Sequence, residues 1–234
     1  MLLCMNTIKT TTGEIIKISN HPVYSGIKPI DKNQASENIA IMKDVLEKNG
    51  VLYFLSYGTL LGAVREHDFI SHDEDIDIVI KDEFRQAFID ILPQFGDNGF
   101  YVVRFDARGL LSLMRNNEYI DFYFFKKYES GLRYCCGYLI PEDFMQEGMC
   151  VEFLGDMYPV HSRYEDFLRF QYGDDWRTPV KYFDFNKSGF SILVAKLKFL
   201  VKSFIPLPLL AFITSKKERR ILEENIQMLE KYRK

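Results

Sequence analysis

The chain has 234 residues, a length that suits one large domain or one domain with an appendage. Hydrophobic residues make up 47% of it and charged residues 27%, a mixture that excludes a disordered or fibrous chain. Its four cysteines form no CxxC pair and show no Cys/His zinc spacing, so neither a disulfide framework nor a structural zinc site is expected. A reducing compartment fits this cysteine usage.

The net charge of −3 is unevenly distributed along the chain. Residues 187–234 carry a net charge of +7, whereas residues 1–186 carry −10. An acidic body does not suit nucleic-acid binding, which needs a continuous basic surface. The charge pattern therefore predicts two parts: a main acidic domain at 1–186 and a basic tail at 187–234.

Apolar spacing and turn residues predict a mixed succession of helices and strands. Strands are expected at Glu14–Ile18, Val51–Leu55, Asp75–Ile80, Phe100–Phe105, Leu110–Arg115, Tyr119–Phe125 and Leu132–Leu139. Helices are expected at Gln34–Lys48, Gly58–Arg65, Asp82–Leu92 and Ser162–Tyr172, with a short helix at Pro141 and two brief strands after it. Asn49-Gly50 should end the first helix and Pro93 the third. This order predicts an α/β or α+β fold built around one mixed sheet with flanking helices.

The tail combines apolar and basic residues. Phe190–Ile213 is strongly apolar but is interrupted by lysines and by two prolines. Its uninterrupted apolar stretches are therefore too short for a helix that spans a bilayer. Lysines among Phe and Leu are typical of a helix lying in the membrane interface, and residues 190–220 would then contact an anionic membrane surface. The alternative is an amphipathic helix packed on the domain or on a partner. Because Met1 to Thr12 lack the apolar core of a signal peptide, we expect a cytoplasmic protein, peripheral at the inner face of the membrane under the first interpretation.

Acidic residues mark the predicted site. Asp75 and Asp77 share one face of a predicted strand, about 6.5–7 Å apart at ~3.3 Å rise per residue. Asp121 lies in another strongly apolar predicted strand. If the strands are neighbours, three carboxylates converge, and such an array favours Mg²⁺ or Mn²⁺. The alternative is that Asp121 hydrogen-bonds Tyr or Arg in an ordinary core network.

A glycine turn precedes these acids. Gly58 and Thr59 lie between a predicted strand and a helix, where free backbone N–H groups bind phosphate. Arg65, late in that helix, would contact a phosphate oxygen or an acid, or else lie at the surface. His67 and His72 are ungrouped histidines and are not assigned to the chemistry.

These motifs together resemble a known family. Gly58 to Arg65, Phe69-Ile70 and Asp73 to Asp77 are similar to the LicD family of phosphocholine transferases, related to fukutin and fukutin-related protein. Tyr119 to Asp121 resembles the family's third-acid strand, and Tyr172 to Trp176 its closing Tyr-Gly motif. Differences occur at Glu66 to Asp68, at Ser71-His72 and at Glu74, and they bear on substrate recognition.

The resemblance implies a nucleotidyltransferase-like fold and a CDP-alcohol donor. Asp75 and Asp77 would hold Mg²⁺ (or Mn²⁺), and Asp121 would complete the metal site and help to deprotonate the acceptor. Gly58 and Thr59 would bind phosphate oxygens, and Arg65 would stabilise charge or order the acids. The product would be a cell-surface glycan, or its precursor, that carries phosphocholine or a similar group on a sugar hydroxyl.

Two other functions are compatible with the same residues. One is a nucleotidyltransferase that places a nucleoside monophosphate on a small acceptor. The other is a non-catalytic, membrane-peripheral binding protein of the same fold. Tyr172, Gly173 and Trp176 are expected to pack a helix end in preference to forming a lid.

Overall fold

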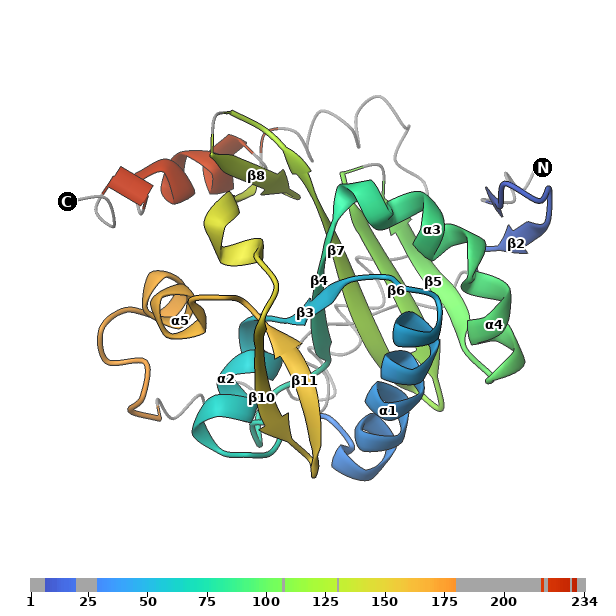
Figure 1. Ribbon diagram of the computed structural model, residues 1–234, viewed down its shortest axis with the longest axis horizontal. Helices are drawn as coiled ribbons and strands as arrows, with labels where there is room; N and C mark the ends of the chain where they lie inside the picture. The colour runs from blue at the N-terminus through green and yellow to red at the C-terminus, as the bar shows by residue number, and fades with distance from the viewer. Residues whose placement is uncertain are drawn as a thin grey trace, which may run out of the picture.

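The computed structural model describes residues 7–19, 29–106, 108–129, 131–179, 216, 219–227 and 229–230. Within these ranges the chain forms a nine-stranded mixed sheet and a small two-stranded sheet (Figure 1). The strands of the small sheet are β1 (Thr7–Lys9) and β2 (Ile15–Lys17). Those of the large sheet are β3 (Tyr53–Leu55), β4 (Ile76–Lys81), β5 (Tyr101–Asp106), β6 (Leu110–Arg115), β7 (Glu118–Lys127), β8 (Leu132–Cys135), β9 (Tyr138–Pro141), β10 (Met149–Phe153) and β11 (Asp156–Val160).

The order in the large sheet is β10-β11-β3-β4-β7-β6-β5, and β8 joins β7 to β9. The pairs β11–β3 and β4–β7 are parallel, and the other pairs are antiparallel. The helices are α1 (Lys32–Lys48), α2 (Tyr57–Arg65), α3 (Arg85–Asp90), α4 (Leu92–Asp97) and α5 (Tyr164–Tyr172), with 3-10 turns at Asp82–Phe84 and Glu142–Met145. The prediction of a mixed sheet with flanking helices is confirmed.

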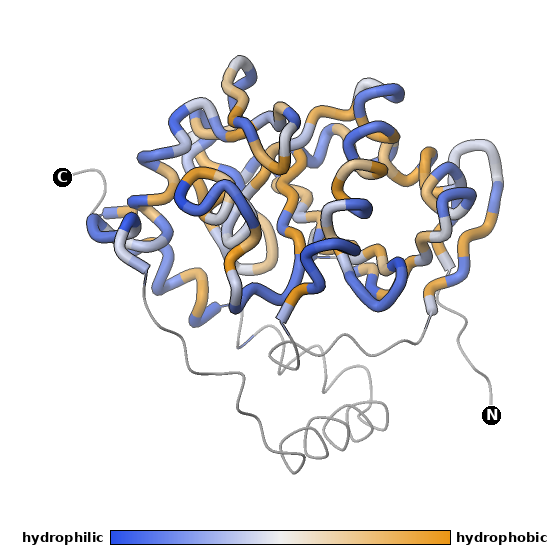
Figure 2. The backbone as a smooth tube through the Cα atoms, turned by 90° about the horizontal axis from the view of Figure 1, so that it is seen from below, coloured by the Kyte–Doolittle hydropathy of each residue, from blue (hydrophilic) through white to orange (hydrophobic). Residues whose placement is uncertain are grey.

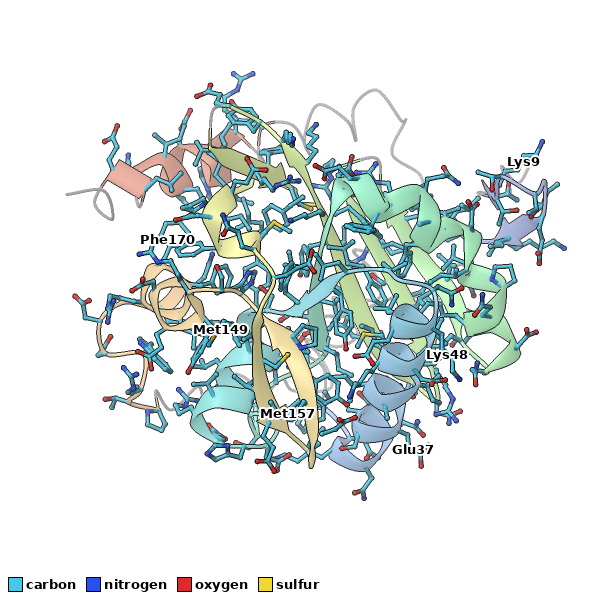
Figure 3. All side chains as sticks on the ribbon, viewed as in Figure 1. Lys9, Glu37, Lys48, Met149, Met157 and Phe170 are labelled. Atoms are coloured by element: carbon cyan, nitrogen blue, oxygen red, sulfur yellow. The ribbon has the colours of Figure 1, made fainter. Side chains whose placement is uncertain are left out.

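The main core lies between one face of this sheet and α1, α3 and α4, which stand in front of it in Figure 1. Phe88 of α3 packs on Phe122 of β7 with ring centroids 4.6 Å apart, and Phe95 of α4 joins them. Because strand side chains alternate between faces, burying Phe122 here places Asp121 on the opposite face. Hydrophobic and hydrophilic stretches alternate along the chain in Figure 2, and the exposed residues Lys9 and Glu37 lie near the edge of the molecule in Figure 3.

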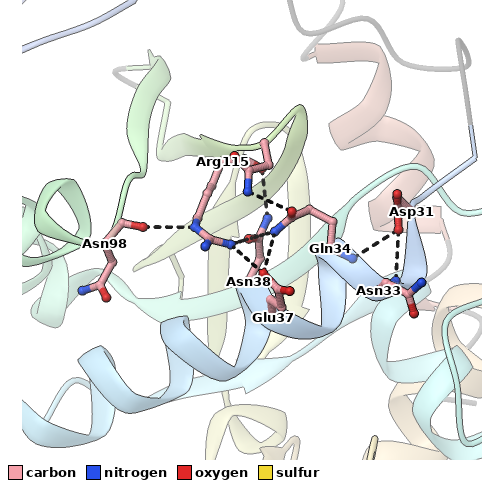
Figure 4. A network of polar contacts seen from close by, with 8 residues as sticks. Asp31, Asn33, Gln34, Glu37, Asn38, Asn98 and Arg115 are labelled. Carbon is pink, nitrogen blue, oxygen red and sulfur yellow. Dashed lines mark hydrogen bonds and ion pairs between the residues drawn. The ribbon is translucent and has the colours of Figure 1, made fainter.

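A polar network fixes α1 against the end of β6 (Figure 4). The Arg115 guanidinium donates to Asn38 Oδ1 at 3.0 Å and to the Asn98 carbonyl at 3.0 Å, and the Asn38 amide donates to the Arg115 carbonyl at 3.2 Å. Asp31 caps the first turn of α1 through its carboxylate. Asn38 is fully buried, so these bonds satisfy polar groups that would otherwise be costly to bury.

Two predicted element boundaries are wrong. Pro93 does not end the helix that starts near Asp82, because it lies in the first turn of a new helix, α4. Proline is tolerated there because N–H groups of a first turn have no partner within the helix. The predicted strand Leu132–Leu139 is a hairpin of β8 and β9, because Cys136 (φ 53°) and Gly137 (φ 98°) reverse the chain between them. Strand β4 begins one residue later than predicted, so Asp75 lies just before it.

Most of the predicted tail, including 190–215, lies outside the described residues. Residues 219–227 are helical, and Asn225 and Leu229 are buried. The Asn225 side chain accepts a hydrogen bond from the Leu139 N–H of β9 at 3.5 Å. This part of the tail therefore packs on the domain. None of the helices in the described ranges combines the length and apolarity that crossing a bilayer requires.

Candidate active site

Four polar residues form a row across four neighbouring strands. Asp77 of β4 is the register partner of Asp121 of β7, and Asp121 is opposite Ser112 of β6. Ser112 is in turn opposite Arg104 of β5. Register partners project from the same face of a sheet, with neighbouring strands about 4.8 Å apart. The sheet thus brings together Asp77 and Asp121, as the sequence predicted for neighbouring strands.

The side chain of Asp121 is held by the protein itself. Its Oδ2 lies 2.5 Å from Arg104 Nη2, and its Oδ1 accepts a hydrogen bond from Ser112 Oγ at 2.5 Å. Arg104 Nε also donates to Ser112 Oγ at 2.8 Å. These partners satisfy a carboxylate that is only 4% exposed. The alternative interpretation of Asp121, a hydrogen-bond network that includes an arginine, therefore describes this arrangement.

The acids on the β4 side have no such compensation. Burial raises the pKa of Asp75 well above its ordinary value, and the charges of Asp77 and Asp121 raise it further. Burial and the charges of Asp73 and Asp121 likewise raise the pKa of Asp77, against smaller lowering effects of hydrogen bonds from the Gly58 N–H and the Tyr123 hydroxyl. Burial is the main cause in both residues, and repulsion from the neighbouring carboxylates adds to it.

Asp73 is a fourth acid of the site, which the sequence analysis did not select. Burial, and then the charge of Glu74, raises the pKa of Asp73 to about 6, although the Glu74 N–H bonded to its Oδ1 acts in the opposite direction. Its Oδ2 is buried, and none of the residues that the structure describes forms a hydrogen bond with it. A Cβ at Gly58 would lie 2.4 Å from this same oxygen, so the carboxylate lies directly against the glycine. The sequence signal that could have identified Asp73 is its position at the start of the acidic motif Asp73 to Asp77.

The turn into α2 is tightly built around the acids. The Gly58 N–H donates to Asp77 Oδ2 at 3.3 Å, and the Asp77 N–H donates to Thr59 Oγ1 at 2.9 Å. Tyr57 has a φ of 45°, an unfavourable conformation for a bulky residue, and its buried hydroxyl has no partner. Gly58 and Thr59 are thus adjacent to the acids as predicted, but the fully buried Thr59 hydroxyl holds the β4 backbone.

His161, which the sequence analysis also missed, supports this turn from behind. Its Nε2 lies 3.0 Å from Ser56 Oγ, and its ring stacks on Phe167 with centroids 4.0 Å apart. Burial lowers the pKa of His161 to about 3, so the ring is neutral at physiological pH. Ser56 is the N-cap residue of α2, but its hydroxyl contacts His161 and does not cap the helix. The Ser56 side chain therefore leaves this end of α2 uncapped, and the anion that the first turn binds in the structure is the Asp77 carboxylate, through the Gly58 N–H.

Arg65 does not join the acidic row. Its Nη2 lies 2.7 Å from Glu66 Oε1, and its Nη1 donates to the Trp176 carbonyl at 3.2 Å. Trp176 is buried and Gly173 ends α5 with a φ of 89°, which agrees with packing at a helix end, whereas Tyr172 is 41% exposed.

The carboxylate oxygens are the kind of ligand that a hard divalent cation prefers, but in this structure they are not spaced as a complete set of metal ligands. Among the residues that the structure describes, no three His, Cys, Asp or Glu side chains are grouped as ligands of one metal ion. However, Asp73, Asp75 and Asp77 are oxygen donors with raised pKa values, and the orphaned Asp73 Oδ2 lacks a positive partner. Such a donor set suits Mg²⁺ or Mn²⁺. Asp121 would join it only by changing its contacts with Arg104 and Ser112.

Comparison with known proteins gives matches centred on this site. Residues 50–160 match the LicD/FKTN/FKRP nucleotidyltransferase domain. An uncharacterized protein of Rickettsia typhi is 30% identical over 134 residues, which cover 56% of this chain and 40% of that protein. The ribitol-5-phosphate transferase FKTN of Macaca fascicularis is 27% identical over 170 residues, which cover 67% of this chain and 36% of that protein. The chain thus spans well under half the length of either relative.

Among solved structures, the lincomycin-bound lincosamide antibiotic adenylyltransferase LnuA aligns with a TM-score of 0.43 and 18% identity. The alignment covers 58% of this chain and 85% of that one.

Proposed function

This chain belongs to the LicD/FKTN/FKRP family through its residues 50–160, and we propose on that premise that it is a metal-dependent phosphotransferase. Its reaction would move a substituted phosphate, such as phosphocholine or ribitol phosphate, from a CDP-alcohol to a sugar hydroxyl. The bond between the two donor phosphates breaks, CMP leaves, and a new phosphodiester forms at the sugar oxygen. The acceptor would be a cell-surface glycan or its precursor.

The observation that carries this proposal is the pairing of Asp77 with Asp121 beside the glycine turn. It places negative side chains, backbone N–H groups and a guanidinium on one face of the sheet. Phosphoryl transfer depends mainly on such positioning and on charge stabilisation.

Each residue has a role that its contacts support. Asp75 and Asp77, with Asp73 beside them, would hold a divalent cation, which polarises phosphoryl oxygens and offsets the charge on the leaving CMP. The Gly58 N–H at the start of α2, which donates to Asp77 Oδ2 in the structure, would exchange this bond for one to a phosphate oxygen when a cation holds Asp77, and His161 keeps Ser56 from capping that end of the helix.

Asp121 would accept the proton of the attacking hydroxyl. A general base must lie within hydrogen-bond reach of the proton it removes, and Asp121 already accepts a hydroxyl hydrogen bond from Ser112. Arg104, bound to the other oxygen of Asp121, places a positive charge next to the reacting groups.

Product analysis tests the proposal. The purified protein is incubated with Mg²⁺, sugar acceptors and, in turn, CDP-choline, CDP-ribitol and CDP-glycerol, and CMP and modified sugar are followed by mass spectrometry. We expect Mg²⁺-dependent CMP release in step with the new phosphodiester, and loss of both in Asp77→Asn. Asp44→Asn is the matched control, since Asp44 is exposed on α1 and pairs with Lys48 on the same helix.

Other outcomes separate the alternatives. A nucleoside monophosphate attached to the acceptor would replace this proposal with nucleotidyl transfer. If no donor is consumed and the protein binds neither nucleotide nor Mg²⁺, a non-catalytic binding protein becomes the better description. Membrane association through 190–220 stays a separate proposal, which vesicles of anionic lipid would test.

A further inference from the structure

The turn between β3 and α2 places a bulky residue in a conformation that favours glycine. Tyr57 has a φ of 45°, in the left-handed region where a side chain crowds the backbone. Glycine would adopt this conformation without that cost, yet the chain has a tyrosine there. Such strain persists only where the surrounding structure holds it in place, and it is frequent at functional sites. The contacts of Tyr57 should therefore show what holds it and what the strain serves.

The residues on either side of Tyr57 are bonded to a single acid. The Ser56 N–H donates to the Asp77 carbonyl at 3.1 Å, and the Gly58 N–H donates to Asp77 Oδ2 at 3.3 Å. The Asp77 N–H donates in turn to Thr59 Oγ1 at 2.9 Å. Tyr57 lies between these anchored residues, so its backbone conformation determines the direction in which the Gly58 N–H points.

Three aromatic rings from separate elements surround the ring of Tyr57. Its centroid lies 5.3 Å from that of Tyr123 in β7, 6.1 Å from that of Tyr138 in β9 and 5.9 Å from that of Phe167 in α5. The ring planes are inclined to one another, an arrangement that aromatic pairs prefer. The Tyr57 hydroxyl is buried, and no residue that the structure describes forms a hydrogen bond with it. The ring, and not the hydroxyl, therefore holds this residue in place.

We propose that Tyr57 is a positioning residue: its ring, held by the three aromatic neighbours, keeps the backbone at this φ and so directs the Gly58 N–H towards Asp77. Relaxation of Tyr57 to a negative φ would turn Gly58 away from Asp77 and from Asp73, whose Oδ2 lies against the glycine. The same N–H is the one that the proposed function assigns to a phosphate oxygen. The effect of Tyr57 on the reaction rests on that function, whereas its effect on the turn does not.

Substitutions at position 57 separate the backbone from the ring. Tyr57→Ala removes the ring but keeps a Cβ in the disfavoured region, so the turn should relax. Tyr57→Gly also removes the ring, but glycine adopts a φ of 45° without a clash and should retain the turn better than alanine. A ring that merely filled the core would give the opposite order, because glycine leaves the larger cavity. Tyr57→Phe keeps the ring and should rescue both measurements described below.

The Gly58 amide can be followed by NMR without metal or nucleotide. Only Gly58 and Gly173 follow a tyrosine, so isotope labels on the glycine nitrogen and on the carbonyl carbon of residue 57 identify the Gly58 signal, with Gly173 as an internal reference. Hydrogen exchange of the Gly58 amide should be about tenfold faster than in wild type for Tyr57→Ala, about threefold faster for Tyr57→Gly and within about twofold for Tyr57→Phe. The kcat for CMP release should fall in the same order, with KM for the donor changed by less than about threefold.

Two variants at other positions complete the experiment. Tyr134→Ala is the matched control, because Tyr134 is a half-buried tyrosine of β8 whose ring stacks on Tyr128 at 5.7 Å, and Gly58 exchange should not change. Tyr138→Leu removes one of the rings around Tyr57 and should speed up Gly58 exchange about threefold. It carries the test if Tyr57→Ala does not fold.

The inference is overturned if Gly58 exchange in both Tyr57→Ala and Tyr138→Leu equals that of wild type. It is also overturned if Tyr57→Gly loses as much protection as Tyr57→Ala, because the ring would then act only by filling space. Equal losses in Tyr57→Phe and Tyr57→Ala would assign the role to the hydroxyl and refute it as well. If wild type turns over no CDP-alcohol, the proposed function fails, and hydrogen exchange alone decides whether Tyr57 positions the turn.

Discussion

Neutralising Asp73 should make the protein more stable while impairing its site. The Asp73 carboxylate is packed against Gly58, one of its oxygens has no partner, and its nearest charges are other acids. In Asp73→Asn the carbonyl can keep the bond from the Glu74 N–H. The new amide N–H can donate to a neighbouring carboxylate, so the substitution replaces repulsion with attraction.

The raised pKa gives the size of the effect. Asp73 has a pKa of about 6 in the folded chain against 3.8 for the free group, a difference of roughly two units, and each unit corresponds to ~1.4 kcal/mol. Because folding disfavours the ionised form, wild type loses stability as the pH rises from about 4 to 6 and does not regain it above. The free energy of unfolding of Asp73→Asn should therefore match wild type near pH 4 and exceed it by up to ~3 kcal/mol at pH 8.

Urea denaturation of both proteins between pH 4 and pH 8, without divalent cations, measures this gap. Asp68→Asn provides the control of opposite sign, because a hydrogen bond from Lys32 at 2.6 Å lowers the pKa of Asp68. The free energy of unfolding of Asp68→Asn at pH 8 should not exceed that of wild type. A gap between Asp73→Asn and wild type that does not change with pH, or a less stable variant at pH 8, would refute the electrostatic reasoning. Added Mg²⁺ should narrow the gap by stabilising wild type more.

Three further substitutions probe the row and its supports. Gly58→Ala places a Cβ 2.4 Å from Asp73 Oδ2, and kcat/KM for CMP release should drop at least tenfold, whereas an unchanged value would show that the turn has room. Arg104→Gln leaves the buried Asp121 charge uncompensated, so urea denaturation should show a loss of ~1–3 kcal/mol, which a second change, Asp121→Asn, should largely restore. Burial lowers the pKa of His161 to about 3, so the wild-type protein should lose stability as the pH falls from 6.5 towards 3. The His161→Phe variant should lose less stability over that range. Its pH profile of activity between 6.5 and 8 should match that of wild type. A shifted profile in that variant would place His161 among the titrating groups of the reaction.

The sequence was sufficient to predict the elements that carry the chemistry. The Asp-x-Asp spacing follows a period of two, and the strand around Asp121 is a continuous apolar run, so local composition reveals both strands. The glycine turn lies at a strand–helix junction that is equally visible in the sequence. Both strands form as predicted, because apolar residues on both faces of β4 and β7 are buried in the sheet.

Register and cross-strand partners could not be predicted in the same way. Arg104 and Ser112 contact Asp121 only because β5, β6 and β7 pair in a particular alignment, with an irregularity between Val102 and Arg104. Likewise, His161 meets Ser56 across 105 residues of sequence. Such contacts depend on tertiary pairing, which no local period encodes. The two wrong boundaries have the same origin, because a proline in a first helical turn and a two-residue hairpin differ little in sequence from a helix end and a continuous strand.

The distribution of charge on the sheet indicates which part of the site awaits a ligand. The protein supplies a cation and a hydroxyl to Asp121, and both oxygens of that carboxylate are satisfied. Among the described residues it supplies no hydrogen-bond partner to Asp73 Oδ2, and it places the half-buried Asp75 two residues before the buried Asp77. Burial of like charges costs stability that a fold without a functional reason would avoid by substitution. The unbalanced charge lies beside the helix start that suits an anion, so a cation and a phosphate bound together would compensate both. Under the proposed function, these acids would therefore repel a bare pyrophosphate, and its approach would require a cation held by Asp75 and Asp77 or carried by the nucleotide.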